Sequence, residues 1–239
     1  MSRNTATIDG SKEKRRYLTL LAGTVALIGS LFIGIAAGAV PITLREVFEV
    51  IQGVTQSENY RIIYYIRMPR VICAALTGTN LALAGCILQG ILRNPLADPG
   101  IIGVTAGAGL AAMALMLISP ELTYFVPFAA FGGAVVASIV VFLLAWEHGI
   151  HPLRLILAGV AIAAFFGGGS AALSVFFSDR IQGTVNWMAG GFAGNSWRHV
   201  VMILPYSAVG IVATMCSYRK LNALQLGDDV AASLGLNVE

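Results

Sequence analysis

The chain has 239 residues, of which 57% are hydrophobic and 11% are charged, and its formal net charge is +3. A soluble domain carries about 25% charged residues, so this composition excludes an ordinary soluble enzyme and indicates an integral membrane protein with room for about six helices. The basic residues are scattered or terminal, so the sequence gives no support for nucleic-acid binding.

The first predicted segment is a polar stretch, residues 1–16, which ends in a basic cluster made up of Lys12, Lys14, Arg15 and Arg16. The apolar run that follows, residues 17–40, is longer than the apolar core of a signal peptide, which has about 7–15 residues, so we expect a retained first span. The basic cluster places the N-terminus in the cytoplasm. The rest of the chain divides into a membrane domain, residues 17–218, and a cytoplasmic tail, residues 219–239.

An extracytoplasmic connection is expected over residues 41–66. Within it, Thr43 and Glu46 have the T-x-x-E spacing of a capping box, which predicts a short amphipathic helix over residues 44–51. Residues 71–92 then contain no charged side chain and are long enough, at about 1.5 Å per residue, to cross a hydrocarbon layer of about 30 Å. We predict the second span there.

A tight polar turn separates the second span from the third. Pro95 and Pro99 lack backbone donors and push the residues before them out of helical geometry, so the helix ends here. Asp98 followed by Pro99 is a favourable N-cap and first-turn pair, which predicts a third span from about residue 99 to residue 118. The two spans form a transmembrane hairpin with its tip in the cytoplasm.

Three further apolar runs predict spans four to six, at about residues 123–146, 153–177 and 199–218. Between the last two lies a polar, glycine-rich segment, residues 178–198, which we expect outside the membrane. The predicted fold class is therefore all-α, a polytopic transmembrane helical protein of about six spans.

The cytoplasmic tail carries the signals of a two-turn helix. The residues that carry these signals are Gly227, Asp228, Asp229, Val230, Leu234 and Gly235. The glycines break the chain on either side, the aspartates lie at the positive end of the helix, and the two aliphatic side chains share a face. A helix this short is not stable alone in water, so either it packs against a partner or it is a frayed end.

Uncharged polar side chains inside the spans are candidates for a translocation path. They are Asn80 and Gln89 in the second predicted span and Thr105 in the third. Amides and hydroxyls can face a water-filled path, but they can also bond across packed helices, which is the alternative. No acidic or basic residue sits in the middle of a predicted span, which disfavours a proton- or ion-coupled carrier.

Arg67 and Arg70 bracket Pro69 at the predicted outer start of the second span. Residues three apart share one face of a helix, and cations at a helix N-terminus oppose its dipole. Two interpretations stay open. The side chains snorkel to lipid phosphates, or they offer a basic pair to a carboxylate on an external partner.

The sequence contains none of the common motifs of soluble enzymes. There is no G-x-x-x-x-G-K-[ST] stretch, so the chain does not bind ATP through a P-loop, and there is no H-E-x-x-H or G-x-S-x-G. The three cysteines lack metal-ligand spacing, and His148 and His151 lie in a turn without further ligands. We expect no catalytic residue, no metal site and no cofactor bound by this chain.

Five longer motifs follow one another along the chain. They are R-x-P-R from Arg67, L-A-L-A-G-x-x-L-Q from Leu81, R-N-P-L-A-D-P from Arg93, W-M-A-G-G-F-x-G from Trp187 and L-G-D-D-x-A-x-S-L-G from Leu226. Together they resemble the permease subunits of bacterial type II ABC importers, which take up iron–siderophores, haem and vitamin B12. The resemblance runs from about residue 61 to the end, and it implies a fold of roughly ten helices, of which this chain corresponds to the first part.

The resemblance also implies partners. A second copy or a related permease would pair with this chain around a central path, two ABC ATPase subunits would bind ATP inside, and a substrate-binding protein would dock outside. In that arrangement Arg67 and Arg70 are docking positions for acidic residues of the binding protein, and residues 227–236 resemble a coupling helix that fits a groove on the ATPase. The leading hypothesis is an importer permease for a ferric siderophore in the bacterial cytoplasmic membrane, in contact with lipid.

The sequence stops just after the coupling segment, where the family continues with about four more helices. This departure keeps alternatives open: a truncated permease fragment that does not transport, an importer permease for haem or vitamin B12, or a six-helix channel or assembly protein. The tail discriminates among them, because a channel has no use for a helix that docks on an ATPase. No motif encodes the substrate.

Overall fold

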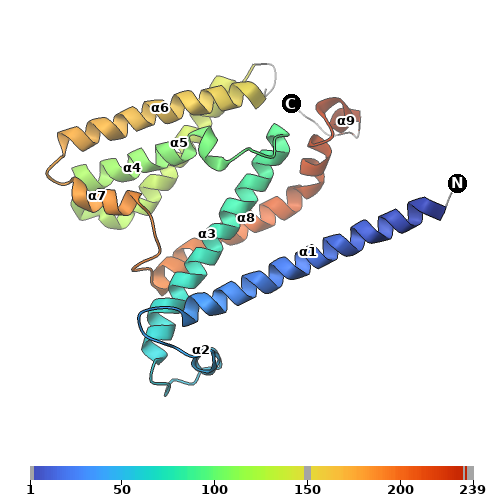
Figure 1. Ribbon diagram of the computed structural model, residues 1–239. Helices are drawn as coiled ribbons and strands as arrows, with labels where there is room; N and C mark the ends of the chain where they lie inside the picture. The colour runs from blue at the N-terminus through green and yellow to red at the C-terminus, as the bar shows by residue number, and fades with distance from the viewer. Residues whose placement is uncertain (1–2, 148–151, 234, 236–239) are drawn as a thin grey trace. The chain divides into compact units, whose positions relative to one another are not determined.

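The computed structural model describes residues 3–147, 152–233 and 235, with residues 3–11 and 228–229 described by their backbone alone. The regular elements in these ranges are all helical, which confirms the predicted all-α class (Figure 1). The chain forms two compact units. One comprises Met1–Thr77 and Phe192–Tyr206, and the other comprises Gly78–Gly191 and Ser207–Glu239.

The first unit contains a long helix, α1 (Arg3–Ala36), and a short one, α2 (Leu44–Ile51). The predicted capping box is confirmed, because the Glu46 amide donates to the Thr43 hydroxyl and the Thr43 amide donates to Glu46 Oε2 at 2.7 Å. The amphipathic spacing of α2 turns one face into a small core, which is made up of Ile35, Ile42, Val47, Val50 and Ile63. Burial of this face holds a helix that is too short to persist alone.

A π-helical segment, η1 (Ile62–Arg67), leads directly into α3 (Met68–Leu92). One continuous helical stretch therefore runs from residue 62 to residue 92. The predicted start of the helix at residue 71 is wrong, because the helix begins at residue 62, inside the segment expected as an extracytoplasmic connection. The predicted end of the second span at Leu92 is confirmed.

Pro69 explains why the helix widens at η1. Its ring clashes with the carbonyl group four residues earlier, and it has no amide to donate. A π-bulge adds one residue to the turn and relieves such a clash. In a π-helix the missing amide would have bonded to the carbonyl oxygen of Tyr64, and the indole Nε1 of Trp197 donates to that oxygen instead, at 2.8 Å.

In the second unit, the predicted turn follows the end of α3. Asp98 caps the next helix as predicted, because its Oδ1 accepts from the Gly100 amide at 2.7 Å. The predicted single helix over residues 99–118 is wrong, since η2 (Pro99–Ile102), a 3-10 helix, is separated from α4 (Val104–Ile118) by Gly103. Gly103 has a φ of +72°, and a side chain there would lie 2.9 Å from the carbonyl oxygen of a neighbouring helix.

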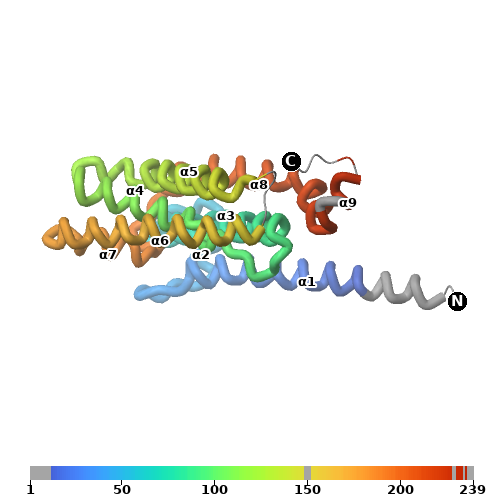
Figure 2. The backbone as a smooth tube through the Cα atoms, turned by 90° about the horizontal axis from the view of Figure 1, so that it is seen from above, coloured from blue at the N-terminus to red at the C-terminus, as the bar shows by residue number. Residues whose placement is uncertain are grey.

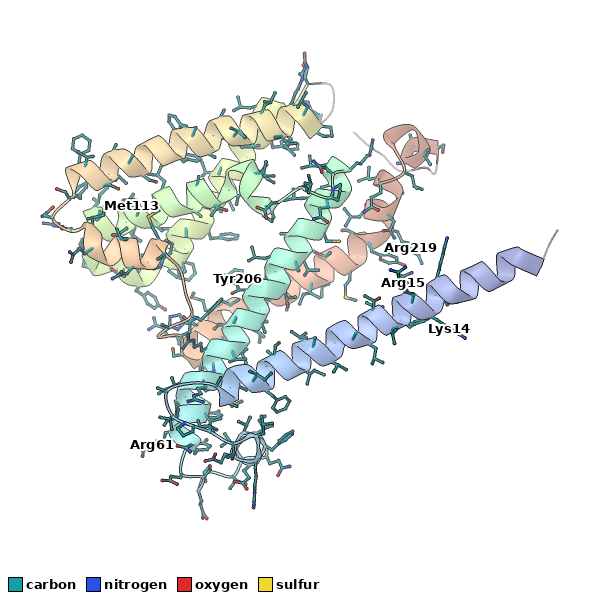
Figure 3. All side chains as sticks on the ribbon, in the orientation of Figure 1. Lys14, Arg15, Arg61, Met113, Tyr206 and Arg219 are labelled. Carbon is teal, nitrogen blue, oxygen red and sulfur yellow. The ribbon has the colours of Figure 1, made fainter. Side chains whose placement is uncertain are left out.

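The next helices form a bundle with α4. They are η3 (Pro120–Phe125), α5 (Val126–Ala145) and α6 (Pro152–Phe176). Helices α4, α5 and α6 lie side by side (Figures 1 and 2), and Met113 of α4, labelled in Figure 3, is buried. The close approach of α4 to α5 requires glycine, because a Cβ on Gly107 would lie 2.7 Å from the carbonyl oxygen of Gly133.

Three further helices follow α6 in the described part of the chain. They are α7 (Ile181–Met188), α8 (Trp197–Leu224) and α9 (Asp228–Ser233). Helix α7 lies in the segment predicted as a polar connection, and it packs against α4. Helix α8 is longer than the predicted sixth span at both ends. The predicted tail helix is confirmed as far as Ser233, and Leu234 lies outside the described residues.

Five of the described helical stretches are long and apolar enough to cross a membrane. They are Lys12–Ala36, Ile62–Leu92, Pro120–Ala145, Pro152–Phe176 and Trp197–Leu224. Helix α4, which corresponds to the predicted third span, has 15 residues and a length of about 22 Å at 1.5 Å per residue, which is less than the hydrocarbon layer. Large apolar side chains face outward along these stretches, as Leu18 at 68% exposure illustrates. The protein is therefore a multi-pass membrane protein.

Candidate functional site

Arg67, one of the two predicted docking residues, is buried, with 8% of its surface exposed. It ends η1, and its guanidinium reaches the C-terminal end of α1. Nη1 donates to the carbonyl oxygens of Ile35 and Ala36, at 2.9 and 2.6 Å, and Nη2 donates to that of Val40 at 2.6 Å. The last carbonyl groups of a helix lack partners within it and carry its negative end. Arg67 therefore caps α1.

Arg70, the second member of the pair, is exposed in the first turn of α3. The two arginines therefore have different surroundings, although they are only three positions apart in the sequence. Arg67 is buried against the end of another helix, whereas Arg70 is exposed. The docking role of the pair stays a prediction. Arg70 is the member whose charge lies at the surface, where a partner can reach it.

A groove of about 720 Å³ opens beside the pair in the first unit. The end of α1, the loop after it and the start of α3 form its walls, which are mostly small and aliphatic. Its lining includes Gly38, Val40, Ile66 and Phe192, and the two arginines supply its charge. These walls suit an apolar surface that carries an acidic side chain.

Asn80, a predicted path residue, is half-buried. Its Nδ2 donates to the Oγ of Ser207 on α8 at 2.8 Å, and Ser207 is buried. The bond joins α3 to α8 within the second unit, which is the helix-packing geometry that the sequence left open as the alternative. Sequence reasoning missed Ser207, whose only signal was a hydroxyl in an apolar run.

Gln89 and Thr105, the other two path candidates, are exposed. Gln89 follows Asn80 by nine positions, or about two and a half turns, so the two amides point to opposite sides of α3. Nε2 of Gln89 lies 3.5 Å from the carbonyl oxygen of Ala97, which is long for a hydrogen bond. A path lined by these residues stays a prediction.

The backbone around α9 has the geometry that the tail sequence indicates. Gly227 has a φ of +114°, and its carbonyl oxygen accepts from the Ala231 amide at 2.9 Å, which begins the helix. Gly235 has a φ of +80°, and its amide donates to the carbonyl oxygen of Ala232. Both glycines therefore hold conformations that few other residues adopt.

The side chains of α9 fall into two groups. Val230 is 43% exposed, whereas Ala231 is fully buried. The side chains of Asp228 and Asp229, and Leu234 as a whole, lie outside the described parts of the chain. The contact of these residues with an ATPase stays a prediction.

The hairpin after α3 contacts the end of α5, the start of α6 and the end of α8 within the second unit. Ala97 in the hairpin packs with Ala145 at the end of α5 and Leu155 near the start of α6. Nε of Arg93 donates to the carbonyl oxygen of Leu224, the last residue of α8, at 2.9 Å. These contacts fit spans that cross in alternating directions.

Among ionisable groups outside the spans, Glu46 has a pKa below its usual value. The Thr43 amide is the main cause, and the Thr43 hydroxyl and the Asn59 side-chain amide, at 2.7 Å from Oε1, act in the same direction. All three donors favour the carboxylate form.

In the described ranges, no three His, Cys, Asp or Glu side chains gather into a metal-binding group.

Comparison with known proteins gives consistent results. A sequence model described as the FecCD transport family matches residues 26–239. The chain is 37% identical over 227 residues to the Fe(3+)-citrate import system permease protein YfmE of Bacillus subtilis, covering 95% of this chain and 68% of that protein. It is 31% identical over 243 residues to the Iron(3+)-hydroxamate import system permease protein FhuG of the same organism, covering 96% of this chain and 71% of that protein.

A solved structure is also similar. It shows an inward-facing conformation of a metal-chelate type ABC transporter, with a TM-score of 0.75 and 26% sequence identity. The match covers 93% of this chain and 68% of that one. The helical fold of the chain is therefore similar to that of a metal-chelate type ABC transporter.

Proposed function

The chain belongs to the FecCD transport family of bacterial ABC importer permeases, and from this premise we propose that it is the membrane-spanning subunit of an ATP-driven importer for a ferric chelate. The observation that carries this substrate class is the similarity to permeases named for ferric citrate and ferric hydroxamate import. A ferric siderophore is the leading substrate, and haem and vitamin B12 are the alternatives within the family.

In this proposal the chain pairs with a second copy or a related permease, and it binds no cofactor itself. Separate ABC ATPase subunits hold ATP in the cytoplasm, and a substrate-binding protein delivers the chelate outside. The basic cluster before the first span supports a cytoplasmic N-terminus in the bacterial inner membrane. That orientation places the groove beside Arg70 outside and α9 inside.

Each site has a proposed task. Arg70 attracts an acidic side chain of the binding protein, and Arg67 contributes by fixing the wall of the groove through its bonds to the end of α1. The tail residues Gly227, Asp228, Asp229, Val230, Leu234 and Gly235 form the element that contacts the ATPase. Asn80, Gln89 and Thr105 stay candidates for the path.

Reconstituted transport tests this function. The chain, with an ABC ATPase and a substrate-binding protein from the same organism, is placed in liposomes, and uptake of radioactive iron is followed for ferric citrate and a ferric hydroxamate. We expect ATP-dependent uptake of at least one chelate. Arg70→Glu should lower uptake at limiting binding protein by about threefold or more, since reversing a charge repels the acidic partner.

The matched control is Arg61→Glu. Arg61, which is labelled in Figure 3, is exposed and lies nine positions before Arg70 in the sequence, and it is not one of the residues that line the groove. We expect its uptake to equal that of the unaltered chain. Equal losses from both substitutions would contradict specific docking at Arg70. Iron uptake that is independent of ATP would contradict the importer and favour the channel alternative.

A further inference from the structure

The C-terminal ends of α3 and α8 both lie in the second unit, and they meet at a contact that we name the α3–α8 junction (Gly90, Arg93, Leu221, Leu224 and Gln225). Arg93 directly follows the last residue of α3, and its Nε donates to the carbonyl oxygen of Leu224, the last residue of α8, at 2.9 Å. Gly90 is buried against the same place, since a Cβ on it would lie 3.4 Å from Nε2 of Gln225 and 3.9 Å from Cδ2 of Leu221.

Electrostatics favour a cation at the junction. Each helix carries a partial negative charge on the unpaired carbonyl groups of its C-terminal end. Neither α3 nor α8 has a basic residue in its own last turn. The guanidinium of Arg93 follows the end of one helix and bonds to the end of the other, so a single cation stabilises both.

The accepting carbonyl group has a second partner. The carbonyl oxygen of Leu224 also accepts from the amide of Gly227, at 3.2 Å, which closes the turn between α8 and α9. Gly227 in turn accepts from Ala231, the residue through which α9 is buried. Arg93 therefore bonds to the peptide group that sets the direction in which α9 leaves α8.

The backbone of Arg93 gives an independent observation. Its φ is +49°, and it is the one residue other than glycine with a positive φ among those that the structure describes. Glycine or asparagine is the usual residue in this left-handed conformation after a helix. An arginine held there against its backbone preference indicates that its side chain has a task at this position.

We propose that Arg93 is a positioning residue that fixes α9 to the end of α3, so that the hairpin tip and the coupling element move as one body. The inference rests on the proposed function in one respect, because the contact of α9 with an ATPase is itself proposed. The mechanical part, the hold of Arg93 on α9, concerns this chain alone.

Distance measurement between two spin labels tests that hold. Labels are placed at Leu96→Cys in the hairpin and Ser233→Cys in α9, both exposed positions of the second unit, in a chain whose Cys73, Cys86 and Cys216 are replaced by alanine. The labelled chain is reconstituted in nanodiscs, diluted with unlabelled chain so that distances within one molecule dominate. We expect a single narrow distance distribution.

The test variant is Arg93→Asn, which removes the guanidinium but tolerates the left-handed backbone. We expect its distance distribution to broaden about twofold, because loss of one charge-assisted bond changes the population of the held state by about tenfold. Arg93→Lys keeps the charge and should restore part of the narrow distribution. An unchanged distribution in Arg93→Asn would overturn the proposal.

The matched control is Arg219→Gln. Arg219 lies near the same end of α8 (Figure 3), and its Nε donates to the hydroxyl group of Tyr218 on its own helix. We expect its distance distribution not to broaden. If it broadens as much as that of Arg93→Asn, loss of any cation at this end of α8 has the same effect, which contradicts a specific role of Arg93. The contact of α9 with an ATPase is tested separately, by the amount of co-expressed ATPase that is purified with the Val230→Asp variant. An unchanged amount would contradict that contact, but it would not affect the interpretation of the distance measurement.

Discussion

At position 67, a guanidinium group takes the place of the amide donors that the chain would have supplied had α1 continued past Ala36. Arg67→Ala leaves the carbonyl groups of Ile35, Ala36 and Val40 without this donor. We therefore expect the thermal midpoint of the protein in detergent, followed by loss of helical circular dichroism, to fall by about 5–10 °C. Lysine should restore only part of the loss, since it lacks the fork that reaches several acceptors.

Arg70→Ala is the control, because an exposed arginine contributes little to stability, and its midpoint should stay within about 1 °C. Equal losses from the two alanine variants would contradict the capping role.

The different surroundings of the two arginines could not be predicted from the sequence. Spacing shows that they share a helix face, but the groups that face Arg67 come from the end of α1 and the loop after it, about 30 residues earlier, which no local pattern encodes.

Helix α2 depends on a hydrogen-bonded carboxylate, so its stability depends on pH. The pKa of Glu46 is lowered in the folded protein relative to about 4.3 for an unfolded glutamate. Its contribution is therefore fully present above that value, and it is lost as the pH falls through the lower folded value. We expect hydrogen exchange of the α2 amides, corrected for intrinsic rates, to lose protection in that acid window, and Glu46→Ala to remove this pH dependence.

Glu49→Ala is the matched control on the same helix, since Glu49 pairs with the exposed Arg45 and does not cap. The α2 amides of Glu49→Ala should still lose protection from hydrogen exchange in acid. If the α2 amides of Glu46→Ala also lose protection in acid, Glu46 is not the group that causes the pH dependence. Features defined by local chemistry, such as α2 with its capping box and the Asp98 cap after the hairpin turn, could be predicted from the sequence. The π-helical start of α3 could not, because Trp197 supplies the bond that Pro69 lacks from far along the chain.

The whole molecule should place alternate turns on opposite sides of the membrane. A cysteine at Leu96, which is 82% exposed, is a better probe of the hairpin tip than one at Ala97, which is buried. In the cysteine-free chain, we expect an impermeant maleimide to label Leu96→Cys only from the cytoplasmic side. Glu121→Cys, at the exposed start of η3, should be labelled only from outside.

Labelling of Leu96→Cys from outside would contradict the proposed orientation. Five of the six predicted spans correspond to long apolar helices, because the bilayer imposes that length. The shortness of α4 could not be predicted. Its start is displaced by Gly103, where α6 passes too close for a side chain, and that approach appears only when the helices are assembled.

The bonds of Arg67 to the end of α1 also bear on how the protein is made. A ribosome delivers α1 first, and the carbonyl groups of Ile35, Ala36 and Val40 keep their bonds to water until the chain has grown past residue 67. The start of the second span, through Arg67, then supplies the hydrogen-bond donors that the end of α1 lacks. The carbonyl groups at this end of α1 therefore gain these bonds only after residue 67 has been made, so the synthesis of the second span limits when the end of the first span can reach its final structure.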